Sequence, residues 1–272
     1  MTNERQNDHQ RVPHVGLFAT CLIDLMRPSV GFAAARLLER AGCRVSVPES
    51  QTCCGQPAYN AGDQKDARAI ATNTIVAFES FDYVVAPSGS CAAMIRVHYP
   101  RLFADEPEML QRAQVLVEKT YELTSFLSDV MQVNKTKAKF NAKVTYHDAC
   151  SGLREMAVKE QPRTLLRSVS GLDLVEAEDR ESCCGFGGLF SVKYPDISTS
   201  MVDDKVDALL ATGADVVLGG DLGCLMNIAG RLKRRGAAME VRHVAEILAD
   251  MAGEVPPIAS RDAGGDGKKG DA

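Results

Sequence analysis

The sequence has no tryptophan, few other aromatic residues and no long apolar run. No stretch of its 272 residues approaches the 18 consecutive apolar residues of a transmembrane helix, so we expect no membrane span. The formal net charge of −5 leaves no basic surface for phosphates, which argues against nucleic-acid binding. Residues 1–11 are polar and lack the apolar segment of a secretory signal, so we expect a cytoplasmic protein.

Motifs for organic cofactors and for nucleophilic catalysis are also missing. The glycine-rich segment 185–188 carries only part of the G-x-G-x-x-G dinucleotide fingerprint, and no phosphate-binding P-loop is present. No G-x-S-x-G nucleophile elbow occurs either. The sequence therefore indicates no catalytic residue, and we expect a non-catalytic protein that carries electrons within an oxidoreductase complex.

Cysteine is the residue that stands out, because eight of the nine cysteines form two matching sets. Each set consists of a lone cysteine, a Cys-Cys-Gly triplet and a second lone cysteine. The first spacing is 31 residues in one half and 32 in the other, and the second spacing is 35 and 38 residues. The two sets are Cys21, Cys53, Cys54 and Cys91, and Cys150, Cys183, Cys184 and Cys224.

Matching cysteines are separated by 129, 130, 130 and 133 positions, which indicates an internal duplication. Short apolar runs alternate with helical patterns, so we predict an α/β protein with two tandem, pseudo-symmetric domains. Each domain should be a small, mostly parallel sheet flanked by helices. We expect a disordered lead-in at 1–13, domains at 14–138 and 139–252, and a disordered tail at 253–272.

The end of each half reads as helical. A long helical pattern covers residues 110–131 in the first half, and segments 122–129 and 243–250 look like equivalent helices. The sequence predicts no strand in either region.

Four cysteines directly follow predicted strands, and the two triplets lie in turn-rich loops. Ligands of open α/β sheets gather where strands end and loops begin, so four thiols from three loops of each half can converge. Because the chain is not a small secreted scaffold, metal sites explain the clustered cysteines better than structural disulfides do. Buried packing cysteines would explain neither the repeat nor the spacing.

We favour iron–sulfur clusters over zinc as the metal. Structural zinc sites commonly use C-x-x-C pairs, and this sequence has none. A cubane cluster takes four thiolates, which matches each set, so we expect two [4Fe-4S] clusters bound by the eight cysteines. Gly55 and Gly185 let backbone N–H groups approach the sulfurs and are expected to contact the cofactor. Zinc remains the alternative metal.

Two further residues have open roles. His147 lies three residues before Cys150 and could donate a hydrogen bond to a cluster sulfur, although a buried histidine with backbone partners is the simpler interpretation. Cys43 has no partner in the second half and is expected to pack in the core.

The doubled pattern resembles the cysteine-rich CCG domain. That domain occurs in the B subunit of heterodisulfide reductase, in the iron–sulfur subunits of glycolate oxidase and anaerobic glycerol-3-phosphate dehydrogenase, and in the lactate-utilization protein A (LutA/YkgE) group. A chain of about this length with only two CCG domains looks most like the last group. The segments 16–21, 53–57 and 88–91 carry the resemblance.

The resemblance implies an electron-transfer role in oxidising L-lactate to pyruvate, in a complex with an iron–sulfur partner and a third subunit. The fullest form of the motif ends in C-x-x-C, but Met94 and Asn227 stand at the last positions here. With four cysteines per site, ordinary four-iron clusters fit this sequence better than the thiol–disulfide chemistry of heterodisulfide reductase. A thiol–disulfide redox protein and a zinc-binding CCG protein are kept as the alternatives.

Overall fold

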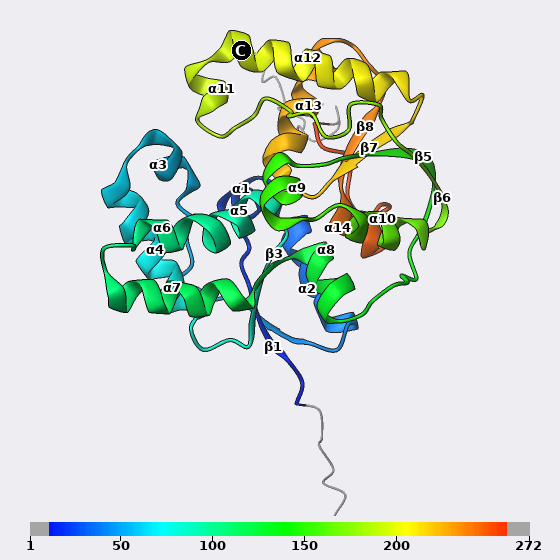
Figure 1. Ribbon diagram of the computed structural model, residues 1–272. Helices are drawn as coiled ribbons and strands as arrows, with labels where there is room; N and C mark the ends of the chain where they lie inside the picture. The colour runs from blue at the N-terminus through cyan, green and yellow to red at the C-terminus, as the bar shows by residue number, and fades with distance from the viewer. Residues whose placement is uncertain (1–10, 260–272) are drawn as a thin grey trace, which may run out of the picture.

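The computed structural model describes residues 11–259 and contains two four-stranded parallel sheets, each flanked by helices (Figure 1). This confirms the predicted α/β class. The expected lead-in lies outside the described residues up to residue 10, and the tail does so from residue 260. Within 11–259, no helix has both the length and the apolar character needed to cross a membrane.

The first half forms a sheet with the strand order β2-β1-β3-β4. Its elements are β1 (His14–Leu17), α1 (Cys21–Met26), α2 (Pro28–Arg40), β2 (Arg44–Ser46), α3 (Gln56–Ala61), α4 (Gln64–Phe78), β3 (Tyr83–Ala86), α5 (Gly89–Ala93), a π-helical turn (Met94–His98), α6 (Tyr99–Leu102), α7 (Pro107–Lys119), β4 (Thr120–Glu122), α8 (Leu123–Ser125) and a second π-helical turn (Phe126–Val130).

The second half repeats this order as β6-β5-β7-β8. Its elements are β5 (Lys139–His147), α9 (Cys150–Met156), α10 (Glu160–Arg167), β6 (Ser170–Val175), α11 (Phe190–Lys193), α12 (Pro195–Ala211), β7 (Val216–Gly219), α13 (Leu222–Arg234), β8 (Glu240–His243) and α14 (Val244–Leu248). In both sheets the chain reverses its winding direction between two central strands, β1 and β3 or β5 and β7. The carboxyl ends of such strand pairs form the crevice in which open α/β sheets bind ligands.

The prediction of one continuous helix over residues 110–131 is wrong, because a strand interrupts two helical segments. Helix α7 ends at Lys119, and residues 120–122 form β4, which pairs in parallel with β3. The second half has the same feature, because β8 occupies residues 240–243 before the short helix α14. Thr120 and Glu122 are buried at the sheet edge. A three-residue strand is too short for its alternation to be distinguished from helical periodicity.

Residues 253–259, which the sequence assigns to the tail, lie against the second sheet. The backbone N–H of Ile258 donates to the carbonyl of Val241, and Arg242 donates to the carbonyls of Ala252 and Val255. The Pro- and Gly-rich composition of this segment gave no sign of these contacts, which depend on a neighbouring strand.

The two halves share one apolar layer. Buried residues of α2 pack with those of α14, and α10 packs with α8, so a single core cluster contains side chains from both halves. Helix α10 is the second-half counterpart of α2, and α14 is the counterpart of α8. The two contacts are therefore related to each other by a pseudo-twofold axis. The layer includes Leu37 and Leu38 from the first half and Leu165 and Leu248 from the second. Each such side chain contributes roughly 1.5–3 kcal/mol by burial, so the layer holds the halves in one orientation.

Helices α5 and α9 touch where the halves meet, near the centre of the molecule (Figure 1). A Cβ atom built on Gly89 would lie 2.8 Å from the Cα of Gly152, which is closer than real Cβ atoms approach backbone. Glycine at position 89 therefore permits the contact. Because α5 carries Cys91 and α9 begins at Cys150, the contact also brings the two cysteine sets together.

We expect Gly89→Ala to lower the free energy of unfolding by about 1–3 kcal/mol, because the added methyl group meets rigid backbone. Gly152→Ala is the matched control, since its Cβ would meet the Cα of Gly89 at an ordinary 3.7 Å. Both glycines lie in the first turn of a short helix, α5 or α9. Urea unfolding measures both, and equal stability of the two variants would contradict the proposed close contact.

Candidate metal centre

The lone cysteines lie at the carboxyl ends of the central strands. Cys21 opens α1 directly after β1, and Cys150 opens α9 after β5. Cys91 lies in α5 after β3, and Cys224 lies in α13 after β7. The triplets occupy the loops that follow β2 and β6. Both sets therefore lie at the crevices that the sheet topology creates.

All eight cysteines line one cleft of about 460 Å³ between the halves. The sequence predicts convergence within each set of four, and the structure brings each set together. That the two sets share one cleft was not predicted. Ala149, Asp221 and the pair His98 and Glu155 also line it.

The thiols of each set lie close to one another. The Sγ atoms of Cys21 and Cys53 are 3.7 Å apart, and all nine cysteines, which lie within residues 11–259, are free thiols. Among the eight cysteines of the two sets, four are partly exposed, namely Cys21, Cys53, Cys150 and Cys183. The other four are buried, namely Cys54, Cys91, Cys184 and Cys224. The ninth cysteine, Cys43, packs in the core with its sulfur 3.8 Å from that of Met131, as expected.

Gly55 and Gly185 hold the triplet loops in the same conformation. Their φ angles of 85° and 77° lie in the left-handed region. The N–H of Gly55 donates to the sulfur of Cys53, and the N–H of Gly185 donates to the sulfur of Cys183, each at 3.4 Å. A Cβ atom on Gly185 would lie 2.7 Å from the carbonyl oxygen of Ser198. Only glycine tolerates both this backbone conformation and this space.

The environment favours a thiolate at the first cysteine of each triplet. Hydrogen bonds from the thiols of Cys21 and Cys54 lower the pKa of Cys53 to about 2, the bond from Cys21 having the larger effect. Hydrogen bonds from Cys150 and Cys184 likewise lower the pKa of Cys183 to about 2. Interaction with Cys53, and burial, raise the pKa of Cys54. Each set thus contains one favoured thiolate, at Cys53 or Cys183. A metal that binds four sulfurs would displace the remaining protons.

Different side chains brace the carbonyl of the second triplet cysteine in the two halves. The hydroxyl of Tyr99 donates to the carbonyl of Cys54 at 2.9 Å, and the Nδ2 of Asn227 donates to that of Cys184 at 2.8 Å. Asn227, a departure from the full motif, thus supports the second triplet loop. Met94, the other departure, is wholly buried in apolar surroundings. Nothing in the sequence pattern indicated the role of Tyr99.

A hydrogen bond joins the residues that precede the two last lone cysteines. Ser88 and Asp221 occupy equivalent N-cap positions, 133 residues apart, before Cys91 and Cys224. The hydroxyl of Ser88 donates to Asp221 at 3.0 Å, and the N–H of Ser90 donates to the same carboxylate oxygen at 3.1 Å. Asp221 therefore orders the loop that carries a cysteine of the other half.

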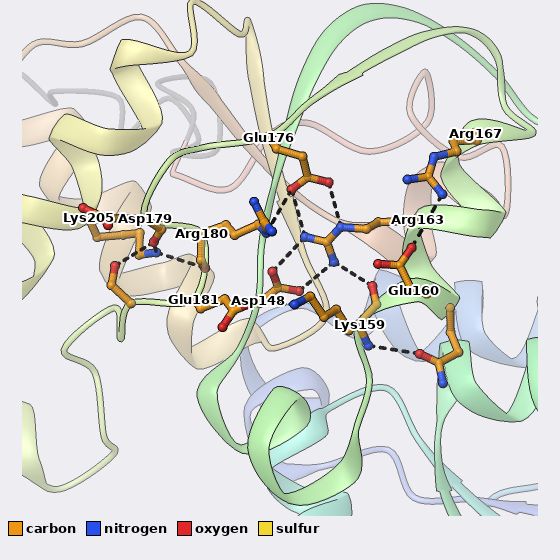
Figure 2. Close-up of polar contacts among 12 residues, drawn as sticks. Asp148, Lys159, Glu160, Arg163, Arg167, Glu176, Asp179, Arg180, Glu181 and Lys205 are labelled. Atoms are coloured by element: carbon orange, nitrogen blue, oxygen red, sulfur yellow. Dashed lines mark hydrogen bonds and ion pairs between the residues drawn. The ribbon is translucent and has the colours of Figure 1, made fainter.

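Buried arginine and lysine side chains support the cysteine loops of the second half. Figure 2 shows Arg163 donating to both carboxylate oxygens of Asp148, at 2.9 and 2.8 Å, and to Glu176. Lys205, wholly buried, donates to the carbonyls of Asp179 and Arg180 in the loop before Cys183. In the first half, the neutral side chain of Gln51 instead bonds the backbone of Ala19 and Leu17.

His147 is the last residue of β5 and is 1% exposed. Its ring lies close to two sulfurs, because one ring nitrogen and the Sγ atoms of Cys184 and Cys224 all lie within 4.8 Å of one another. Burial lowers the pKa of His147 to about 3, so the imidazole is neutral near pH 7. The expected backbone partner is absent among residues 11–259, since neither ring nitrogen has a hydrogen-bond partner there.

The donor set fits a metal centre. Two thiolates bound to one metal atom at about 2.3 Å are separated by about 3.8 Å, the edge of a tetrahedron. The 3.7 Å between Cys21 and Cys53 is close to that value, so these two sulfurs can bind the same metal atom. A cubane with one thiolate on each iron would require them to move apart.

Comparison with known proteins places the chain in a family. The cysteine-rich CCG domain matches residues 15–96 and 144–229. Lactate utilization protein A of Shouchella clausii is 51% identical over 86% of this chain and 98% of its own length. The protein of that name from an Exiguobacterium species is 50% identical over 87% of this chain and 97% of its own length.

The chain belongs to the lactate utilization protein A family. Among solved structures, a hypothetical protein from Helicobacter pylori has a similar fold, with a TM-score of 0.64 and 11% sequence identity to this chain. The match covers 88% of this chain and 49% of that one. The two CCG matches coincide with the two cysteine sets, so the duplication inferred from spacing is a duplication of this domain.

We expect Asp221→Ala to lower the free energy of unfolding by about 1–3 kcal/mol, because the buried Ser88 hydroxyl and Ser90 N–H lose their acceptor. The loop that carries Cys91 should also loosen, although Asp221 belongs to the other half. Asp24→Ala removes an exposed carboxylate and is the control. Urea unfolding and limited proteolysis measure the effect, and a variant as stable as the control would argue against the cross-half brace.

Proposed function

We propose that this protein is the iron–sulfur electron-transfer subunit of a system that oxidises L-lactate to pyruvate. The observation that supports it best is the single cleft lined by all eight cysteines of the duplicated CCG motif. The two sets would hold two clusters, four cysteines to each. The free thiols suit a reducing compartment such as the cytoplasm.

The size of the cleft favours clusters over single ions. Structural zinc sites are closed, with four ligands packed around one ion. Here about 460 Å³ of open space adjoins the eight sulfurs, which is room that two single ions do not need. Bound iron–sulfur clusters would accept and release single electrons at potentials set by their surroundings.

The residues of this chain would hold, shield and tune those groups. The strand ends and triplet loops position the thiols, and the N–H groups of Gly55 and Gly185 point at sulfur. Hydrogen bonds of this kind stabilise the negative charge on a sulfur ligand. The buried thiols Cys54 and Cys184 keep part of each set away from water.

The lactate part of the proposal comes from the relatives, which are named lactate utilization protein A. Oxidation of L-lactate to pyruvate releases two electrons and two protons. We propose that this chain receives the electrons one at a time from a partner subunit. An iron–sulfur subunit and a third subunit would complete the complex, and this chain would perform no chemistry on lactate itself.

A zinc-binding or thiol–disulfide protein is the second candidate. The 3.7 Å between the sulfurs of Cys21 and Cys53 suits one tetrahedral ion without rearrangement. The lowered pKa of Cys53 would also suit a nucleophilic thiolate. Metal content separates this candidate from the first.

We expect protein purified without oxygen to be brown and to contain close to eight iron atoms. Cys53→Ser and Cys183→Ser should each lose about half of that iron, because each removes a thiolate from one set of four. Cys43→Ser should keep it, since Cys43 lies in the core away from the cleft. Elemental analysis and electron paramagnetic resonance give the answer. Colourless protein with one or two zinc ions, or iron retained in both triplet variants, would reject the proposal.

A further inference from the structure

The two cysteine sets are alike in their thiols but differ in the side chains behind them. In the second half His147 stands three residues before the first lone cysteine, and in the first half Phe18 holds that position. Phe18 is wholly buried and packs in one apolar cluster with Cys54 and Cys91. The fold is therefore satisfied by an apolar ring here and does not require an imidazole.

A second difference lies in the long helix that follows each triplet. Gly55 faces the carbonyl of Ala67 and the side chain of Ile70, and Gly185 faces Ser198 and Met201 in the same way. Matching these contacts aligns α4 with α12 at an offset of 131 residues. Lys205 then corresponds to Thr74, a buried neutral residue whose hydroxyl donates to a carbonyl of its own helix.

Within residues 11–259, the imidazole of His147 has no hydrogen-bond partner. A neutral imidazole has one N–H donor and one acceptor, and leaving a buried donor unpaired is costly. His243, which is also buried, accepts the N–H of Ala245 at its Nδ1 and so caps α14, while its Nε2 has no partner within residues 11–259. His147 differs in having no partner there at either ring nitrogen. Two sulfurs of the second set, Cys184 and Cys224, lie within reach of the ring of His147. The four thiols already supply a cubane's four ligands, so the N–H remains available for a bond to sulfur.

Lys205 contributes positive charge to the same place. It is wholly buried and donates to two backbone carbonyls beside Cys183, at 2.6 and 3.2 Å, and within residues 11–259 it forms no ion pair. The negative charge of Asp148 is balanced by its bidentate ion pair with Arg163. Glu176 also pairs with Arg163, and its side chain is one-third exposed, so water screens its charge. Asp221 lines the cleft, and its carboxylate accepts hydrogen bonds from Ser88 and Ser90 of the loop that carries Cys91.

We call the cluster bound by the first cysteine set the first centre, and the cluster bound by the second set the second centre. We infer that His147 and Lys205 make the second centre the more easily reduced of the two, so that it receives electrons from the first. This inference rests on the proposed iron–sulfur function. In the step, one electron leaves the reduced first centre and enters the oxidised second centre, and no proton or bond is transferred. An N–H bond to sulfur and a nearby cation both stabilise the added negative charge, which raises a reduction potential.

A redox titration of the full-length protein, loaded with clusters and followed by electron paramagnetic resonance, tests the inference. Two reduction steps at different potentials are expected. The Cys183→Ser variant, which keeps only the first centre, should lack the higher step. His147→Phe copies the first half and should lower the higher potential while leaving the lower one unchanged.

Three further variants make the result specific. Lys205→Met should also lower the higher potential, whereas Lys193→Met removes an exposed charge from the same half and should leave both unchanged. His147→Gln keeps an N–H donor and should restore part of the shift. If His147→Phe loses iron, the Gln and Lys205 variants decide the question.

Two outcomes overturn the inference while leaving the proposed function intact. One is a pair of centres with equal potentials, and the other is a higher potential that neither His147→Phe nor Lys205→Met lowers. Protein without reducible clusters would instead reject the proposed function itself. The two failures are thus distinguishable in one experiment.

Discussion

The close approach of α5 and α9 determines how the rest of the molecule is arranged. Both helices begin at carboxyl ends of central strands, and the absence of a side chain at Gly89 lets their backbones touch. Because each helix carries a cysteine, this contact converts two separate strand-end crevices into one cleft. The shared apolar layer, which includes residues of α2, α10 and α14, also holds the two halves together.

The two halves share their backbone geometry because of the duplication, but they differ in the side chains around the cysteines. Strand order, the left-handed glycines and the thiol positions are the same in both halves. Ser88 and Asp221, by contrast, began as equivalent residues and now bond to each other across the pseudo-twofold axis. A symmetric pair of serines or aspartates could not form this charged hydrogen bond, so asymmetry at one position stabilises the association of the halves.

The buried polar groups of the second half have a cost that needs an explanation. Burying Asp148, Arg163 and Lys205 requires desolvation of charged groups, a cost that a neutral residue such as Thr74, the counterpart of Lys205, avoids. Hydrogen bonds offset much of that cost, and they also hold the loops that carry Cys150 and Cys183 (Figure 2). Polar groups kept at such a cost beside a cluster of thiols are consistent with a functional role for their charge.

The fold class, the duplication and the membership of the two cysteine sets could be predicted from the amino-acid order, because strand–helix alternation and repeated cysteine spacing are visible along the chain. The amino-acid order also identified Gly55 and Gly185, whose neighbours in sequence create the turn. Strands β4 and β8, the shared cleft, the bonds of Tyr99 and Asp221 and the missing partner of His147 were decided only in the tertiary structure. Each depends on residues far apart in the chain, and their contacts leave no periodic or compositional signal in either segment alone.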